Sequence, residues 1–191
     1  MATRSGERKN QILQVLASML EAPKGEKITT AALAARLDVS EAALYRHFAS
    51  KAQMYEGLIG FIEESVFGLI NKISTEQESG LKQTHAVAAM LLSFAEKNPG
   101  MTRVLIGDAL VNEDTRLQAR INQLHDRLEA TLKQSLRLAA TQGGVDKDAD
   151  VTAQANLMLA YITGRWHQYA KSGFKRLPTE LWQKQAPMLL G

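Results

Sequence analysis

Apolar residues recur at helical spacing along almost the whole of this sequence, and this periodicity limits the folds that it can adopt. In the clearest example, successive apolar positions lie three or four residues apart and therefore share one face of a helix. That series consists of Leu117, Ile121, Leu124, Leu128 and Leu132. Valine, isoleucine and threonine do not gather in alternating runs, which half-buried strands require. The pattern predicts an all-α protein.

Capping residues divide this pattern into about nine helices. Thr29 and Ser40 are good N-cap residues for the second and third helices, and Ser50 has the capping-box spacing with Gln53 at the start of the fourth. The later helices are expected over residues 51–73, 81–97, 102–110, 113–140, 146–171 and 179–189. The apolar positions of the fourth are Met54, Leu58, Phe61, Ile62, Val66, Leu69 and Ile73.

Composition excludes several classes of protein. The chain is 45% hydrophobic and 23% charged, as in ordinary globular proteins, and its longest apolar run is far shorter than the roughly 20 residues that a membrane span needs. It contains no cysteine, and its four histidines are widely separated, with no HExxH motif and no glycine-rich phosphate loop. We expect a soluble cytoplasmic protein that is not an enzyme and holds no metal or cofactor.

The excess of basic residues lies at the start of the chain. Residues 1–51 contain 8 Lys or Arg and 5 Asp or Glu, whereas residues 52–191 contain 15 of each. A basic segment ahead of a neutral body is typical of a module that faces a polyanion.

The segment SEAALYRHFASK, residues 40–51, has the features of a helix that enters the major groove of DNA. It follows a short helix after a tight turn, as in a helix-turn-helix. Ala42 and Ala43 would let its backbone approach the base edges, while Tyr45, Arg46 and His47 would reach phosphates or a base from its far end. A short pattern of this kind also occurs in ordinary helical bundles.

The stretch ITTAALAARLDVSEAALYRHFASKAQMYEGLI resembles the DNA-binding domain of TetR-type regulators. We therefore expect a helix-turn-helix DNA-binding domain over residues 1–50 and a helical dimerisation and partner-binding domain over residues 51–191. Asp38 replaces the usual glycine of the turn, at a position expected to need a left-handed backbone. The residues expected to contact double-stranded DNA are Thr29, Thr30, Ser40, Glu41, Ala42, Ala43, Tyr45, Arg46, His47 and Lys51.

Segments downstream, including FAEKNPGMTRVLIGDAL and RLQARINQLHDRLEATLKQ, are similar to the nucleoid occlusion factors within this family. That resemblance implies a homodimer that binds a palindromic DNA site, associates with the nucleoid and engages the C-terminal tail of the division protein FtsZ. Whether higher oligomers form on DNA stays open. The resemblance places the tail between the fourth and fifth helices, at Phe61, Leu69, Met90, Ser93, Lys97 and Asn98. Leu69 and Ser93 depart from the pattern, which has arginine and glycine there.

The last two helices are expected to supply the dimer interface. They carry apolar stripes and both tryptophans, and tryptophan is enriched at interface hot spots. The interface is expected to include Met158, Ile162, Trp166 and Trp182. Packing inside one chain is the alternative for part of these stripes.

A conventional TetR-type repressor is the alternative function. Its body would bind a small apolar effector that releases the protein from DNA. Residues of a suitable type for such a pocket are Met90, Phe94, Met158 and Tyr161, although core packing explains them equally well.

Overall fold

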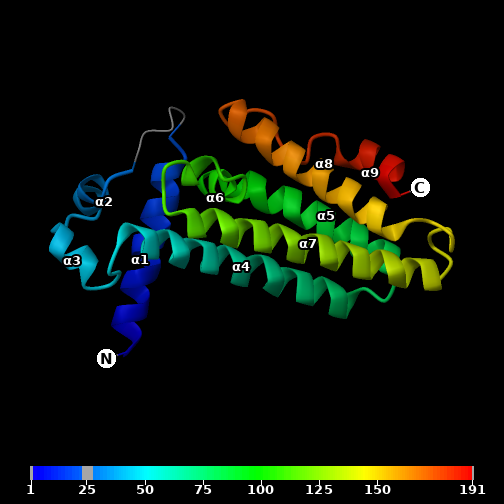
Figure 1. Ribbon diagram of the computed structural model, residues 1–191, viewed down its shortest axis with the longest axis horizontal. Helices are drawn as coiled ribbons and strands as arrows, with labels where there is room; N and C mark the ends of the chain where they lie inside the picture. Colours follow the sequence, from blue (N-terminus) through cyan, green and yellow to red (C-terminus); the bar gives the residue numbers. More distant parts are fainter. Residues whose placement is uncertain (1, 23–27, 191) are drawn as a thin grey trace. The chain divides into compact units, whose positions relative to one another are not determined.

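The computed structural model describes residues 2–22 and 28–190, which contain nine α-helices, one short 3-10 helix and no β-strand (Figure 1). The all-α prediction is therefore confirmed. The helices are α1 (Ala2–Leu20), α2 (Thr30–Arg36), α3 (Glu41–Tyr45), α4 (Lys51–Glu76), α5 (Gly80–Lys97), α6 (Pro99–Leu105), α7 (Thr115–Thr141), α8 (Val151–Lys171) and α9 (Trp182–Leu190), and the 3-10 helix is η1 (Asp108–Leu110).

The chain forms two compact units, of which the first consists of residues 1–62 and 99–121. It combines α1, α2, α3 and the start of α4 with α6, η1 and the start of α7. Its core is formed by fully buried side chains, among them Ile12, Leu16, Leu33, Leu44, Met54 and Leu58. Burial of each such side chain stabilises the fold by about 1.5–3 kcal/mol, and α2 is held by packing on α1 and α3 by packing on α2.

Within this unit, α6 packs very closely on α1. Gly100 lies in the first turn of α6, and a Cβ atom at this position would overlap the backbone carbonyl of Ala17. Only glycine permits the two helix backbones to approach so closely.

Arg103 caps the C-terminal end of α1. Its Nη1 donates to the carbonyl oxygens of Leu20 at 3.3 Å and Ala22 at 3.0 Å. Carbonyls at a helix end lack helical partners, and a cation there is also favoured by the helix dipole. The same guanidinium binds Asp108 Oδ2 through Nε and Nη2, at 3.0 and 2.9 Å. Arg103 therefore ties the end of α1 to η1.

The second unit consists of residues 63–98 and 122–191. In it α8 packs on α5, and α9 lies against both helices (Figure 1). Trp166 is fully buried, and its indole N–H donates to the carbonyl oxygen of Leu91 at 3.2 Å. The Tyr169 hydroxyl donates to the carbonyl oxygen of Glu96 at 2.9 Å. Both large aromatic side chains are therefore buried with their polar atoms hydrogen-bonded.

The helix predicted over residues 102–110 differs from the one observed. Pro99 begins α6, because proline at the first helical position lacks only an N–H that has no helical partner. The helix ends at Leu105, and Gly107 takes a left-handed backbone with φ of 78° before η1 begins. Two short elements, α6 and η1, therefore replace the single predicted helix, and the first begins at Pro99 rather than at residue 102.

α8 and α9 begin later than the sequence predicts, since their expected starts are residues 146 and 179. Asp150 is the N-cap of α8, because its Oδ1 accepts from the amides of Thr152 and Ala153, both at 3.0 Å. The helix therefore begins at Val151. α9 begins at Trp182, after a turn.

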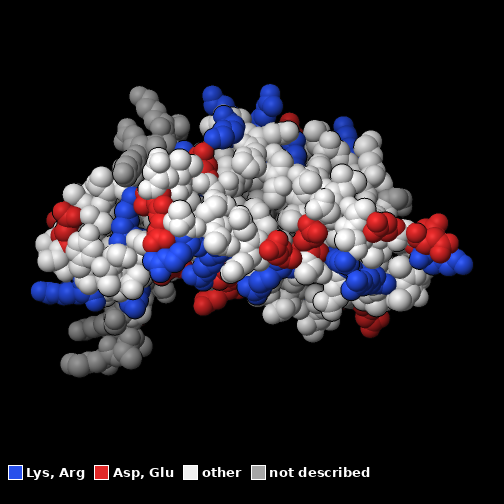
Figure 2. Space-filling view, viewed as in Figure 1, with Lys and Arg blue, Asp and Glu red and all other residues white. Residues whose placement is uncertain are grey.

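Charged side chains of both signs are interspersed on the visible surface. Figure 2 shows basic and acidic groups interspersed on this face rather than gathered by sign. In the described part of the chain, no helix has both the length and the apolar character that crossing a membrane requires.

Candidate nucleic-acid interface

α2 and α3 form a helix-turn-helix whose two helix starts are fixed by hydroxyl side chains. Thr29 Oγ1 accepts a hydrogen bond from the amide of Ala32 at 3.1 Å, and Ser40 Oγ accepts from the amide of Ala43 at 3.2 Å. Both predicted N-caps are confirmed. Because each oxygen accepts, its own hydrogen is left to donate, and a phosphate oxygen is a suitable acceptor.

The turn between the helices bends at Asp38, whose φ of 54° confirms the predicted left-handed backbone. The amide of Val39 then donates to the carbonyl of Ala34 at 3.0 Å and closes the turn on α2. Leu44 and Phe48 are buried in the core of the unit, as predicted. The orientation of α3 is therefore fixed from both ends.

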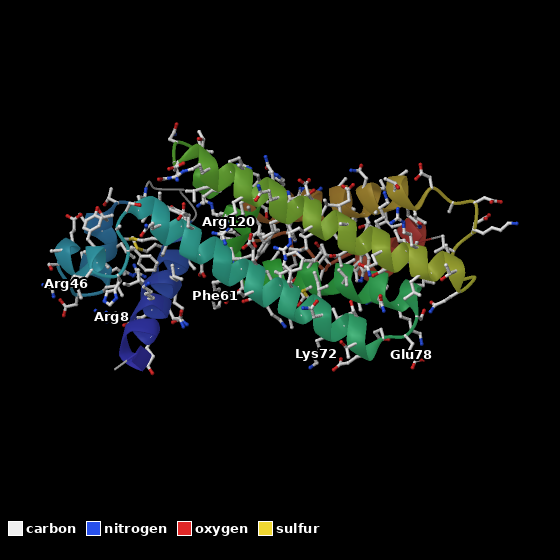
Figure 3. The ribbon with its side chains drawn as sticks, turned by 60° about the horizontal axis from the view of Figure 1, so that its bottom comes forward. Arg8, Arg46, Phe61, Lys72, Glu78 and Arg120 are labelled. Carbon is white, nitrogen blue, oxygen red and sulfur yellow. The ribbon has the colours of Figure 1, made fainter. Side chains whose placement is uncertain are left out.

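The other side chains of α3 and of the residues that follow it are accessible. Ala42 is exposed and Ala43 half-buried, so the start of the helix carries no bulk. Tyr45 is 45% exposed, Arg46 is exposed at the end of α3 (Figure 3), and His47 is half-buried. This face presents methyl groups first and then hydrogen-bonding groups, which is the pattern expected of a helix that contacts base edges and flanking phosphates.

Glu41 is held by a neighbouring hydroxyl. Thr30 Oγ1 donates to Glu41 Oε2 at 2.6 Å, and the Tyr45 hydroxyl donates to Thr30 Oγ1 at 3.5 Å. A carboxylate repels phosphate, so Glu41 cannot serve as a phosphate contact while it is ionised. The observed bonds instead hold the starts of α2 and α3 together.

Lys51 is already paired. Its Nζ forms an ion pair with Glu113 Oε1 at 2.5 Å, and the two side chains are only 22% and 14% exposed. The ammonium also lies 5.6 Å from the ring centroid of Tyr55. Burial, together with the nearby charge of Glu113, raises the pKa of Tyr55 far above its ordinary value.

Glu113 was not found by sequence reasoning. It is 62 residues from Lys51, at a position with no capping role or motif. Arg103 was missed for the same reason, because its bonds to the end of α1 join residues more than 80 positions apart. Only the fold brings these partners together.

The six residues expected to bind a partner are divided between the two units. Phe61 belongs to the first unit, and the other five belong to the second. Phe61 is 39% and Leu69 42% exposed, so both side chains are accessible to a partner. Met90 and Ser93 are half-buried, and Lys97 is exposed. These accessible side chains present a ring, aliphatic groups and a cation.

Asn98, the sixth of these residues, ends α5. Its Nδ2 donates to the carbonyl oxygen of Phe94 at 2.7 Å. The helix-ending role that the sequence left open is therefore present, and the amide is held in a fixed position.

The four residues expected at the dimer interface lie in the core of the second unit instead. Met158, Ile162, Trp166 and Trp182 are almost entirely buried within a single chain, so they offer no area to a second one. This corrects the expectation for these side chains. Large exposed apolar side chains in the same region are Leu157, Leu177, Leu181 and Met188.

Known proteins resemble this chain over nearly its whole length. Residues 25–58 match the family described as bacterial regulatory proteins, tetR family, and residues 70–191 match the SlmA-like family described as tetracyclin repressor-like, C-terminal domain. A protein named nucleoid occlusion factor SlmA from Alteromonas mediterranea is 51% identical over 184 residues, 96% of this chain and 94% of that protein. One of the same name from Idiomarina loihiensis is 49% identical, covering 97% and 94%.

Solved structures show the same fold. The transcriptional regulator FadR from Bacillus subtilis, in complex with stearoyl-CoA, matches with a TM-score of 0.77 over 95% of this chain and 97% of its own. The two sequences are only 15% identical, so this likeness supports the fold alone.

Proposed function

Because the chain belongs to the nucleoid occlusion factor SlmA group of the TetR family, we propose that it binds palindromic chromosomal DNA as a homodimer and restrains FtsZ assembly over the nucleoid. Membership makes it a TetR-type DNA-binding nucleoid occlusion factor and not an enzyme. One observation carries the proposal: the 51% identity to a named member extends through the C-terminal region as well as the helix-turn-helix.

In the proposed complex, α3 of each protomer lies in a major groove. TetR-family DNA-binding regulators act as dimers, and two recognition helices meet half-sites about one helical turn, roughly 34 Å, apart. Ser40, Glu41, Ala42, Ala43 and Arg46 would lie near the bases. Thr29, Thr30, Tyr45, His47 and Lys51 would lie near the backbone.

Tyr45→Ala should weaken DNA binding about tenfold, as expected for loss of one hydrogen bond to a charged group. A phosphate contact carries no sequence information, so the loss should be the same for a palindromic operator and for unrelated duplexes. Fluorescence anisotropy with both DNAs measures this, with Tyr161→Phe in the second unit as the control. A loss confined to the operator would instead assign Tyr45 to base recognition.

The FtsZ tail is proposed to contact Phe61, Leu69, Met90, Ser93, Lys97 and Asn98. Exposure of the Phe61 ring and the Lys97 ammonium supports this, because a tail with apolar and acidic groups needs both kinds of contact. Binding of a fluorescent FtsZ C-terminal peptide, with and without operator DNA, is the test. Tighter binding with DNA supports the proposal, since nucleoid occlusion requires the DNA-bound state to be preferred. No binding in either state would contradict it.

The dimer is proposed to form through exposed apolar side chains of α8, α9 and the turn before α9, namely Leu157, Met188 and Leu181. Leu157→Ala should shift the monomer–dimer midpoint about tenfold toward higher protein concentration, because Leu157 is 54% exposed in one chain and would be covered in two. The far-UV spectrum should not change. Sedimentation over a dilution series measures the midpoint, and an unchanged midpoint would exclude this face.

A further inference from the structure

Lys51 stands where the DNA-binding module continues into α4, yet its side chain is mostly covered and already paired with a carboxylate. Its ion pair with Glu113 joins the first residue of α4 to the segment between η1 and α7. The Lys51 side chain is 22% exposed, whereas each member of the Lys72–Glu76 pair on the same helix is more than half exposed. The geometry of the first pair is therefore enclosed by the fold and not a chance surface contact.

We propose that Glu113 competes with the DNA backbone for Lys51, so that Glu113 limits the affinity of the protein for DNA. The inference rests on the DNA-binding function proposed above. A carboxylate and a phosphate present the same kind of acceptor to an ammonium, and they repel each other when both are ionised. The ammonium is held between the Glu113 carboxylate and the Tyr55 ring, and in the proposed competition it leaves Glu113 when it binds a phosphate.

Release of Lys51 has a second consequence, at the segment 111–114. The Glu113 side chain is only 14% exposed and lies beside the buried Tyr55. A carboxylate without its partner is unfavourable in such a place, so Glu113 would turn toward water. The hydrogen bond from its backbone amide to the carbonyl oxygen of Leu110, at 3.0 Å, does not depend on the side chain and would remain. DNA binding would thus remove the ion pair that joins the first residue of α4 to the segment between η1 and α7.

The test is a double-mutant cycle read by anisotropy with a non-operator duplex. Glu113→Gln frees Lys51 and should tighten binding about fivefold, the size of a partly buried ion pair. In the Lys51→Ala background the same change should alter binding less than twofold, because only its long-range charge effect remains. Glu76→Gln, which breaks the exposed pair with Lys72, is the matched control and should alter binding less than twofold.

Two results would overturn the inference. If Glu113→Gln weakens binding while its melting temperature is unchanged, Glu113 orients Lys51 toward phosphate instead. If Glu113→Gln tightens DNA binding equally in the presence and in the absence of Lys51, the Glu113 carboxylate acts only through long-range repulsion of the DNA. Failure of the wild-type protein to bind any duplex would instead remove the proposed function itself.

Discussion

Gly100→Ala is expected to destabilise the first unit by roughly 3 kcal/mol or more and to abolish DNA binding. The added methyl group would overlap the Ala17 carbonyl, which belongs to the backbone of α1 and cannot turn aside as a side chain could. α1 and α6 must then separate. Because α2 packs on α1 and α3 packs on α2, the helix-turn-helix would lose its support as well.

The measurement is a urea unfolding curve followed by circular dichroism, together with anisotropy on a duplex. Gly68→Ala is the matched control: Gly68 is exposed in α4, nothing lies within 4 Å of an added Cβ, and alanine there should stabilise the helix by about 0.5–1 kcal/mol. Replacing glycine by alanine is therefore expected to lower the free energy of unfolding at position 100 and to raise it at position 68. Wild-type stability and DNA affinity in Gly100→Ala would mean that α6 does not lie against α1 in this way.

Trp166→Ala should destabilise the second unit by about 3–5 kcal/mol. The indole is fully buried, so its removal leaves a cavity, and the carbonyl of Leu91 loses a donor. The loss should be independent of protein concentration in a range where the protein is monomeric, because the partners of Trp166 lie in its own chain.

Concentration dependence distinguishes this result from an interface role. If Trp166 lay between protomers, Trp166→Ala would act chiefly on the monomer–dimer equilibrium and leave the monomer stable. Thermal unfolding at several protein concentrations separates the two cases. Leu157→Ala is the counterpart expected to change association and to spare the monomer.

Local features of the candidate interface were predictable from sequence. The caps at Thr29 and Ser40 and the left-handed Asp38 follow from the chemistry of single residues and their nearest neighbours, so reading the chain in order finds them. The all-α fold follows from periodicity over longer windows in the same way.

The face that each helix buries was less predictable. α4 carries apolar side chains around most of its circumference, and the structure buries Tyr55, Ile59 and Ile70 while leaving Phe61 and Leu69 exposed. Spacing groups residues on one face but does not say what covers that face. The stripe of α8 shows the same limit, because α5 of the same chain covers it where a second protomer was expected.

Both tryptophans of the chain, Trp166 and Trp182, are buried in the second unit. Tryptophan emission therefore monitors only that part of the molecule, whereas ellipticity reports helices throughout. Divergent midpoints from these two optical signals would reveal stepwise melting, and superimposable curves would indicate one cooperative transition.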